Sequence, residues 1–210
     1  MEQRRETAII GVGAVGAGFG HRLAETGQRV VFGVRPGRDV SELLDTIGSR
    51  ARATSVPDAV AAADVVVLAV PAEAAVASLD GAVLDGKIVI DATNPLSFDG
   101  AVRWAPPAEG SMTAHLAAVR PEARWVKALA TFGADHHRDP QRHGAPIDAH
   151  LAGDDEKAKQ HVAAILESAG FGPLDCGPLD LAGALENLAV LWIELAQRHG
   201  RQIAFQLVGR

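Results

Sequence analysis

Cysteine and long apolar runs are what this chain most lacks. Its 210 residues include one cysteine, Cys176, so no internal disulfide can form, and we expect a cytoplasmic protein whose thiol stays reduced. No apolar run approaches the roughly 18 residues of a membrane-spanning helix, which argues against a membrane protein. Residues 1–10 lack the pattern of a signal peptide, because glycines follow their short apolar run at once.

Positive charge is also scarce. Lys and Arg number 20 against 26 Asp and Glu, which gives a formal net charge of −6. This balance gives no support to nucleic-acid binding, and we expect a small molecule or a cofactor as the substrate. The chain is long enough for one nucleotide-binding core and a modest addition, but too short for a large helical second domain.

Glycine is concentrated near the start, in the segment AIIGVGAVGAGFG at 8–20. The apolar run 7–10 predicts a buried strand, and a helical pattern follows the glycines. This order of strand, glycine turn and helix is the context that a dinucleotide-binding loop requires. Gly11 permits the tight turn, Gly13 lets the backbone approach a pyrophosphate, and Gly16 lets the helix pack against the strand.

The loop after the second predicted strand, 29–33, distinguishes between two cofactors. An NAD-binding protein places Asp or Glu there to accept hydrogen bonds from the ribose. This chain has no acid before Asp39 and carries Arg35 and Arg38 instead. Both arginines are suited to the 2′-phosphate of NADP through charge-assisted hydrogen bonds. NADP is therefore the predicted cofactor, and two solvated loop arginines are the alternative.

Alternating strands and helices predict an α/β fold of the Rossmann type, a doubly wound, mainly parallel sheet with a small C-terminal α/β extension. We expect an NADP-binding Rossmann domain at 1–145 and a small domain that closes the cleft at 146–210. Further strands are predicted at 51–54, 64–70, 87–92, 125–129, 147–152 and 171–176, with a strand or extended tail at 203–208. Helices are predicted at 41–47, 56–63, 73–79, 112–119, 156–169 and 181–197.

Ligands of such sheets lie beyond the carboxyl ends of the strands. Val70 and Pro71 follow one buried strand, and Asn94 and Pro95 follow the next one. Asn94 is a candidate to hydrogen-bond the ribose or carboxamide of a nicotinamide. Turn chemistry before proline explains this asparagine equally well.

Two stretches are predicted to be irregular, namely the one with Asp99-Gly100 and 106–110, and the loop 130–144. Long loops in compact domains tend to be functional or mobile. The helix predicted at 181–197 is apolar around most of its surface, so we expect it to be buried in the core or against a second subunit. A homodimer is therefore predicted.

Several catalytic constellations find little support. His136, His137 and His143 share a loop but lack the spaced cysteine or carboxylate partners of a zinc site, so no metal is predicted. The nucleophile elbow GxSxG of serine hydrolases is absent. His115 is the best lone acid–base candidate, with a surface or packing role as the alternative. No catalytic side chain is predicted.

A series of motifs runs through nearly the whole chain: IIGVGAVGAGF, VVFGVR, ADVVVLAVP, IVIDATNPL, WVKAL, LAGDDEKAK, GFGPLDCGPL and LENLAVLWIELA. This series resembles the coenzyme F420-dependent NADP oxidoreductase family. The resemblance implies a Rossmann domain that binds NADP and a small C-terminal domain that closes over a cleft. It also implies hydride transfer between C4 of the nicotinamide and C5 of the deazaflavin F420.

The resemblance also assigns residues. The family's pyrophosphate loop matches Val12, Gly13, Ala14 and Val15, its 2′-phosphate site matches Val34, Arg35 and Arg38, and its nicotinamide side matches Val70, Pro71, Asn94 and Pro95. Val34 replaces the usual serine, so one hydroxyl contact is missing. Ala130 stands where the family usually carries His or Asn near the hydride-transfer centre. With Phe132 and Gly133 it forms the predicted substrate pocket.

The sequence therefore predicts an NADP(H)-dependent oxidoreductase that exchanges hydride with F420. One alternative is an NADP(H)-dependent reductase of another small acceptor, such as a carbonyl, an imine, a flavin or a metal complex. Another is a non-catalytic protein that binds or senses NADP(H). Hydride transfer between two cofactors needs orientation and exclusion of water from the protein rather than an acid or a base.

Overall fold

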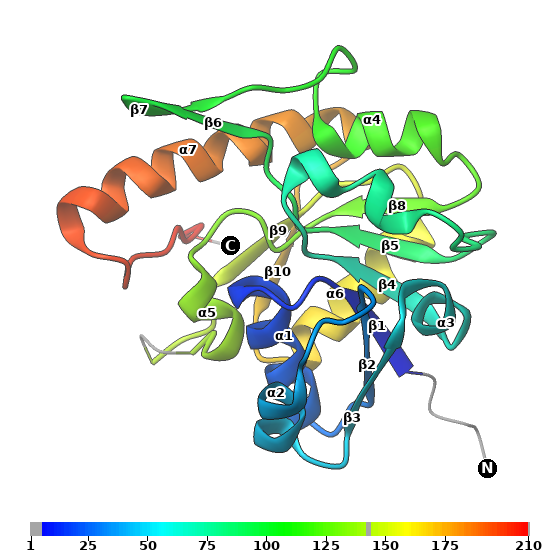
Figure 1. Ribbon diagram of the computed structural model, residues 1–210. Coiled ribbons are helices and arrows are strands. Elements are labelled where there is room, and N and C mark those ends of the chain that lie inside the picture. Colours follow the sequence, from blue (N-terminus) through cyan, green and yellow to red (C-terminus); the bar gives the residue numbers. More distant parts are fainter. Residues whose placement is uncertain (1–5, 142–143, 210) are drawn as a thin grey trace.

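The computed structural model describes residues 6–141 and 144–209. The first five residues, part of the segment considered as a signal peptide, and His143 lie outside this part of the chain. The largest sheet has six strands, all paired in parallel, in the order β3-β2-β1-β4-β5-β8 (Figure 1). Its strands are β1 (Glu6–Ile10), β2 (Val30–Val34), β3 (Ala51–Ser55), β4 (Ala63–Leu68), β5 (Ile88–Asp91) and β8 (Arg124–Lys127).

This strand order is that of a Rossmann fold, in which the order of the strands reverses between β1 and β4. The predicted fold class is therefore confirmed. The α-helices of the described part are α1 (Ala14–Glu25), α2 (Ser41–Ile47), α3 (Val56–Ala61), α4 (Met112–Val119), α5 (Ala134–Arg138), α6 (Glu156–Ser168) and α7 (Ala182–His199).

Helices cover both faces of the sheet because successive strand residues point in opposite directions. Ile9 lies in one apolar cluster with Phe19 of α1 and Leu166 of α6. Its neighbour Ile10 lies in a second cluster on the other face, with Val60 of α3. Burial of each large apolar side chain stabilises the fold by about 1.5–3 kcal/mol, so the two clusters fix the sheet between two helical layers.

A small parallel sheet of β9 (Asp148–Leu151) and β10 (Gly172–Asp175) adjoins the main sheet. An antiparallel bridge between Lys127 and Ala152 connects it to the edge strand β8. The C-terminal helix α7 packs against α4 and β9. None of the helices in the described ranges is both long and apolar enough to cross a membrane.

Three segments differ from the prediction. The stretch expected to be irregular contains an antiparallel hairpin of β6 (Leu96–Asp99) and β7 (Ala101–Trp104), which turns at Gly100 with φ of +69°. The expected loop 130–144 contains α5. The expected helix 73–79 consists of two 3₁₀ turns, Ala72–Ala74 and Ala77–Leu79. Such short elements depend on tertiary packing more than on sequence periodicity.

Helix α7 is buried along one face rather than around its surface. Leu191 is 50% exposed within this chain, so the core of a single copy does not cover this side of the helix. The hairpin packs against the helix, and the two extend together from the body of the molecule (Figure 1). The buried residues of α7 are Ala182, Gly183, Leu185, Glu186, Ala189, Trp192 and Ala196.

His137 on α5 is buried among apolar side chains. Its Nε2 lies 3.0 Å from the carbonyl oxygen of Leu129, and its Nδ1 lies 3.3 Å from that of Gly133. Burial removes the water that would solvate an imidazolium, which lowers the pKa of His137 from 6.5 to about 4. The folded protein therefore holds this side chain neutral at physiological pH.

The stability of the protein should consequently fall in mild acid. The unfolded chain takes up the His137 proton near pH 6.5 and the folded chain only near pH 4, so the contribution is complete above pH 6.5 and is lost as the pH falls. We expect this residue to lower the free energy of unfolding by about 2 kcal/mol between pH 7 and pH 5. Urea unfolding measures the change, which His137→Gln should remove and His161→Gln, at an exposed position, should preserve. The same pH dependence in wild type and His137→Gln would contradict this account.

Candidate functional site

The glycine loop after β1 has the geometry that its sequence predicts. Gly11 has φ of +107°, and a Cβ built there would lie 2.3 Å from the carbonyl oxygen of Ala69. A Cβ on Gly16 would lie 2.0 Å from the carbonyl oxygen of Gly11. Both positions therefore require glycine.

Gly13 differs from the other two glycines. A Cβ built at Gly13 would meet nothing within 4 Å, so the space beside this backbone is open to a ligand. Gly13 is also the N-cap of α1 and contributes no side-chain hydrogen bond there. The first-turn N–H groups and the positive end of the helix dipole are thus available to an anion such as a pyrophosphate.

The loop after β2 lies next to the glycine loop. Val34 ends the strand, and the side chains of Arg35 and Arg38 are exposed. Val12 and Arg38 line the same hollow, which has a volume of about 210 Å³. Asp39 also lines it, and hydrogen bonds from the Ser41 hydroxyl and N–H hold the pKa of the Asp39 carboxyl below its usual value. The structure therefore places the two predicted phosphate-binding elements side by side.

The turns after β4 and β5 continue this edge of the sheet. The N–H of Ala69, before Val70 and Pro71, donates to the carbonyl oxygen of Ile10 at 2.8 Å. The Asn94 amide, before Pro95, donates to the carbonyl oxygen of Ala130 at 3.0 Å. The residues assigned to the nicotinamide side and Ala130 thus follow neighbouring strands, because β5 lies between β4 and β8.

Two polar atoms at this end are left without a partner. The Asn94 Oδ1 and the Thr93 hydroxyl are buried and have no hydrogen bond within the described part of the chain. An unsatisfied buried polar atom costs about 1–3 kcal/mol, so such atoms are usually satisfied by a ligand or water. A carboxamide and ribose hydroxyls supply the donors that these oxygens need. The residues present therefore fit a nicotinamide nucleotide.

The three residues of the predicted substrate pocket are packed against other parts of the chain. Phe132 stacks on Phe171 with ring centroids 5.5 Å apart, and a Cβ on Gly133 would lie 2.4 Å from the Trp192 ring. Both Phe132 and Gly133 therefore belong to the packed interior and do not line an open pocket. The Ala130 side chain is also buried, at 5% exposed, and its carbonyl oxygen accepts a hydrogen bond from the Asn94 amide.

The turn that leads to Ala130 has an unusual backbone. Leu129 has φ of +61°, a left-handed conformation that costs a residue with a side chain about 1–3 kcal/mol. It is the one residue other than glycine with positive φ in the described ranges. Residues in such conformations cluster at functional sites, where the surrounding structure holds them in place.

The histidines lie elsewhere. Nδ1 of His115 is 3.1 Å from Oε2 of the partly exposed Glu109, so this histidine pairs near the surface of α4. His136 and His137 are buried on α5 and face backbone carbonyl oxygens. Within residues 6–141 and 144–209, no group of three or more His, Cys, Asp or Glu is arranged for a metal ion. A hollow of about 800 Å³ lies along α1 between α2 and α5, and neither Asn94 nor Ala130 lines it.

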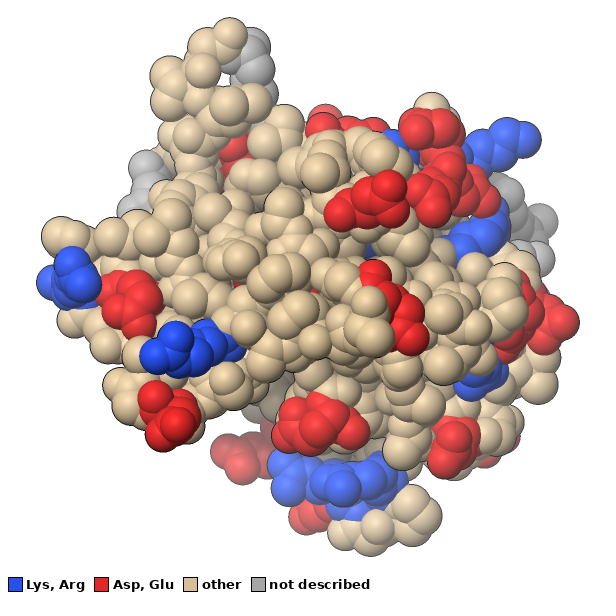
Figure 2. Space-filling model, turned by 90° about the horizontal axis from the view of Figure 1, so that it is seen from above, with Lys and Arg blue, Asp and Glu red and all other residues tan. Residues whose placement is uncertain are grey.

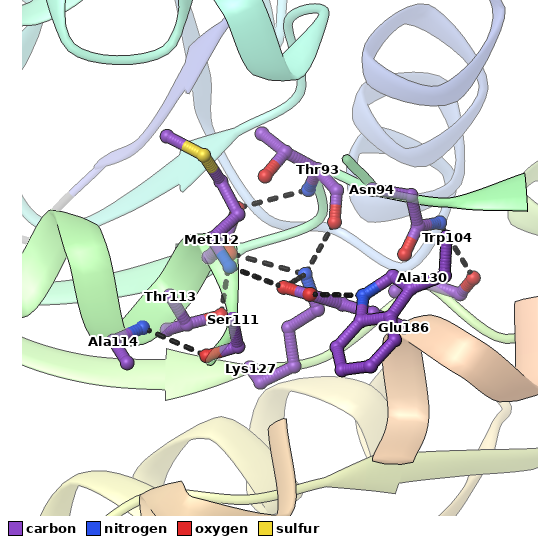
Figure 3. A network of polar contacts seen from close by, with 11 residues as sticks. Thr93, Asn94, Trp104, Ser111, Met112, Thr113, Ala114, Lys127, Ala130 and Glu186 are labelled. Atoms are coloured by element: carbon purple, nitrogen blue, oxygen red, sulfur yellow. Dashed lines mark hydrogen bonds and ion pairs between the residues drawn. The ribbon is translucent and has the colours of Figure 1, made fainter. Parts of the chain in front are cut away.

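Three charged side chains next to the Thr93–Asn94 turn were not predicted from the sequence. Asp91, Lys127 and Glu186 are each 0% exposed and form what we call the charged cluster. Figure 3 shows Lys127 and Glu186 of this cluster. The Lys127 ammonium lies 3.1 Å from Oδ2 of Asp91 and 3.2 Å from Oε1 of Glu186, and it donates to the carbonyl oxygen of Thr93. Its three N–H groups therefore have three acceptors.

The sequence held one signal for this cluster. Asp91 and Lys127 end the otherwise apolar runs IVID and WVK, where a charged residue is buried only if it is paired. Nothing local indicates that Glu186, on a helix far along the chain, joins them. The partner becomes evident only when α7 is placed against α4 and β7.

Comparisons with known proteins agree with this geometry. The model of the family "NADP oxidoreductase coenzyme F420-dependent" matches residues 6–95. The chain is 32% identical to the F420-dependent NADP reductase of Methanothermobacter thermautotrophicus, over 91% of this chain and 88% of that protein. It is 28% identical to the enzyme of the same name from Methanothermobacter marburgensis, over 88% of this chain and 89% of that protein.

A solved structure extends the likeness to the whole fold. The crystal structure from Arthrobacter sp. FB24, provisionally assigned as an F420-dependent NADP reductase, superposes with a TM-score of 0.88 at 30% identity. The match covers 98% of this chain and 100% of that one, so it includes the C-terminal extension as well as the sheet. By sequence and by structure, the chain belongs to the family of coenzyme F420-dependent NADP oxidoreductases.

Proposed function

We propose that this protein transfers hydride between NADP(H) and coenzyme F420. The observation that carries the proposal is the row of strand ends along one edge of the sheet. The glycine loop, the Arg35–Arg38 loop and Asn94 follow β1, β2 and β5, at the positions where a dinucleotide crosses such a sheet. The relatives named F420-dependent NADP reductase support F420 as the second reactant.

When both cofactors are bound, hydride passes between C4 of the nicotinamide and C5 of the deazaflavin, so that NADPH, F420 and a proton from water give NADP⁺ and reduced F420. The protein binds, orients and excludes water. Gly13 and the start of α1 hold the pyrophosphate, and Arg35 and Arg38 hold the 2′-phosphate. The sides of the proposed cofactor site are completed by Val34, Val70, Pro71 and Pro95. The Asn94 amide group is fixed by Ala130 on one side, and its free Oδ1 orients the carboxamide.

The arginine loop should set the preference for NADP over NAD. Loss of one charge-assisted hydrogen bond to a phosphate costs about 1.5–3 kcal/mol, or roughly ten- to a hundredfold in affinity. We expect Arg35→Ala to weaken NADP⁺ binding by this factor and to leave NAD⁺ binding nearly unchanged. Titration calorimetry with both cofactors measures this. The control is Arg50→Ala. Arg50 precedes the start of β3, at the opposite end of the strands from the Arg35–Arg38 loop, so this change should alter neither affinity. Equal losses for NADP⁺ and NAD⁺ in Arg35→Ala would contradict the assignment.

The acceptor is tested by following NADPH oxidation at 340 nm with and without F420. We expect turnover that depends on F420 but is slow in wild type, because Ala130 lacks the side chain that relatives carry at this point. Ala130→His should accelerate it, while Ala118→His, on the outer part of α4, should not. Tight binding of NADPH without F420-dependent turnover in any of the three proteins would exclude F420 and favour another small acceptor.

We further propose a homodimer and a cytoplasmic location, together with a cofactor-binding part at 1–145 and a smaller part at 146–210. The single cysteine, which suits a reducing compartment, supports the location. The β6–β7 hairpin and α7 together form what we call the arm. Phe98 of the hairpin is 74% exposed, and Leu191 of α7 is 50% exposed, so the arm presents apolar side chains to a second copy.

The surface charge does not favour nucleic acid as a partner. The face in Figure 2 has a wide central area with few charges, and its Lys and Arg side chains are scattered among acidic ones, whereas a nucleic-acid-binding surface gathers basic residues.

The arm can be tested without disturbing the core. We expect Leu191→Asp to halve the mass of the particle in light scattering while leaving the circular-dichroism spectrum unchanged, since Leu191 is half exposed in the single chain. Val83→Asp introduces the same charge at a side chain 67% exposed and away from the arm, and should keep the wild-type mass. A monomeric wild type, or a Leu191→Asp protein of unchanged mass, would refute the proposed interface.

A further inference from the structure

The charged cluster carries a net charge that its contacts define. Oδ1 of Asp91 accepts from the N–H of Thr93 at 2.9 Å, and Oδ2 accepts from the Thr113 hydroxyl at 2.6 Å and from Lys127. The Thr93 N–H and the Lys127 ammonium can only donate, and the Thr113 hydroxyl donates to Oδ2. A carboxylate that only accepts is ionised, because a protonated carboxyl would need an acceptor for its own hydrogen. Asp91 is therefore negative.

Glu186 has the same kind of environment. Its Oε2 accepts from the Trp104 indole at 3.0 Å, and its Oε1 accepts from the N–H of Met112 at 2.9 Å and lies 3.2 Å from the Lys127 ammonium (Figure 3). Two carboxylates thus share one lysine. Among the described side chains, Lys127 is the only cation in ion contact with either of them. The cluster holds one uncompensated negative charge in the interior.

This charge lies close to the predicted nicotinamide. Lys127 donates to the carbonyl oxygen of Thr93, and the next residue is Asn94, whose unpartnered Oδ1 is at the nicotinamide end. A hydrogen bond of about 3 Å to Thr93, one Cα–Cα step of about 3.8 Å and one further hydrogen bond from Asn94 to the carboxamide together place the cluster roughly 10 Å from a ring held by Asn94. Buried charges at this distance are screened far less than surface charges.

We propose that the Asp91–Lys127–Glu186 cluster discriminates between the two redox states of the cofactor and favours NADP⁺, whose nicotinamide ring is positive, over NADPH, whose ring is neutral. The proposal rests on the proposed function in placing the ring beside Asn94. The cluster then stabilises the positive charge that the ring carries once hydride has left C4, and so lowers the free energy of bound NADP⁺ relative to bound NADPH. Glu186 and Asp91 are positioning and charge-bearing residues, since neither touches the reacting atoms.

The experiment measures dissociation constants for NADP⁺ by calorimetry and for NADPH by its fluorescence, in the absence of any acceptor. For the wild type we expect NADP⁺ to bind at least as tightly as NADPH. Glu186→Gln neutralises the cluster, and we expect it to weaken NADP⁺ by about tenfold, the effect of one charge roughly 10 Å away at an effective dielectric constant near 20. NADPH should change by less than twofold, because its ring has no charge.

Two controls separate charge from shape. Trp104→Phe removes a donor to Glu186 without changing any charge, so it should affect both redox states equally. Glu6→Gln removes a carboxylate paired with Arg52 at the opposite end of β1, and should change neither constant. If Glu186→Gln does not fold, Asp91→Asn makes the same charge change, and the wild-type preference is measurable in any case.

Several outcomes would overturn the proposal. Equal losses for NADP⁺ and NADPH in Glu186→Gln would mean a merely structural role. A wild type that binds NADPH tenfold more tightly than NADP⁺ would contradict the direction of the effect. Failure of either cofactor to bind the wild type would instead reject the proposed function, and absence of F420 turnover would leave these binding constants, and the inference drawn from them, unaffected.

Discussion

The interaction on which the rest of the structure depends is the contact of the Lys127 ammonium with two carboxylates and a carbonyl oxygen. Burial of these charges is tolerable only because every N–H of the ammonium and both carboxylates are satisfied. Removal of one partner from such a buried pair typically costs about 3–5 kcal/mol. The cluster joins the ends of β5 and β8 to α7 and, through Trp104 and Met112, to β7 and the start of α4. The carboxyl ends of β5 and β8 are therefore connected directly to the C-terminal helix.

The site is made largely of backbone. Gly11 and Gly16 bring the chain so close to itself that no side chain fits, and Gly13 keeps the adjacent space open at the start of α1. An anion bound there meets N–H groups that the helix itself leaves unpaired. In the function that we propose, side chains enter at the two ends of the site, where Arg35 and Arg38 provide charge and Asn94 provides an orienting amide. This division suits a reaction in which the cofactors carry the chemistry and the protein holds them still.

The turn that follows β8 is held by contacts with the interior. Leu129 has a left-handed backbone, and hydrogen bonds hold the turn on both sides of it. The Nε2 of His137 lies 3.0 Å from the carbonyl oxygen of Leu129, and the Asn94 amide donates to the carbonyl oxygen of Ala130. Phe132 then turns inward to stack on Phe171, and Gly133 makes room for Trp192. The residues after β8 are thus buried, Ala130 among them at 5% exposed.

The sequence by itself determined the sheet, the glycine loop and the preference for a phosphorylated cofactor. Alternating apolar patterns and the steric demands of Gly11 and Gly16 act over a few residues, so they can be read locally. The tertiary structure decided what depends on segments far apart in the chain. Asp91, Lys127 and Glu186 meet only when β5, β8 and α7 pack together. The hairpin at 96–104 and the inward turn of Phe132 likewise follow from the surfaces they pack against, because a short element gains most of its stability from its neighbours.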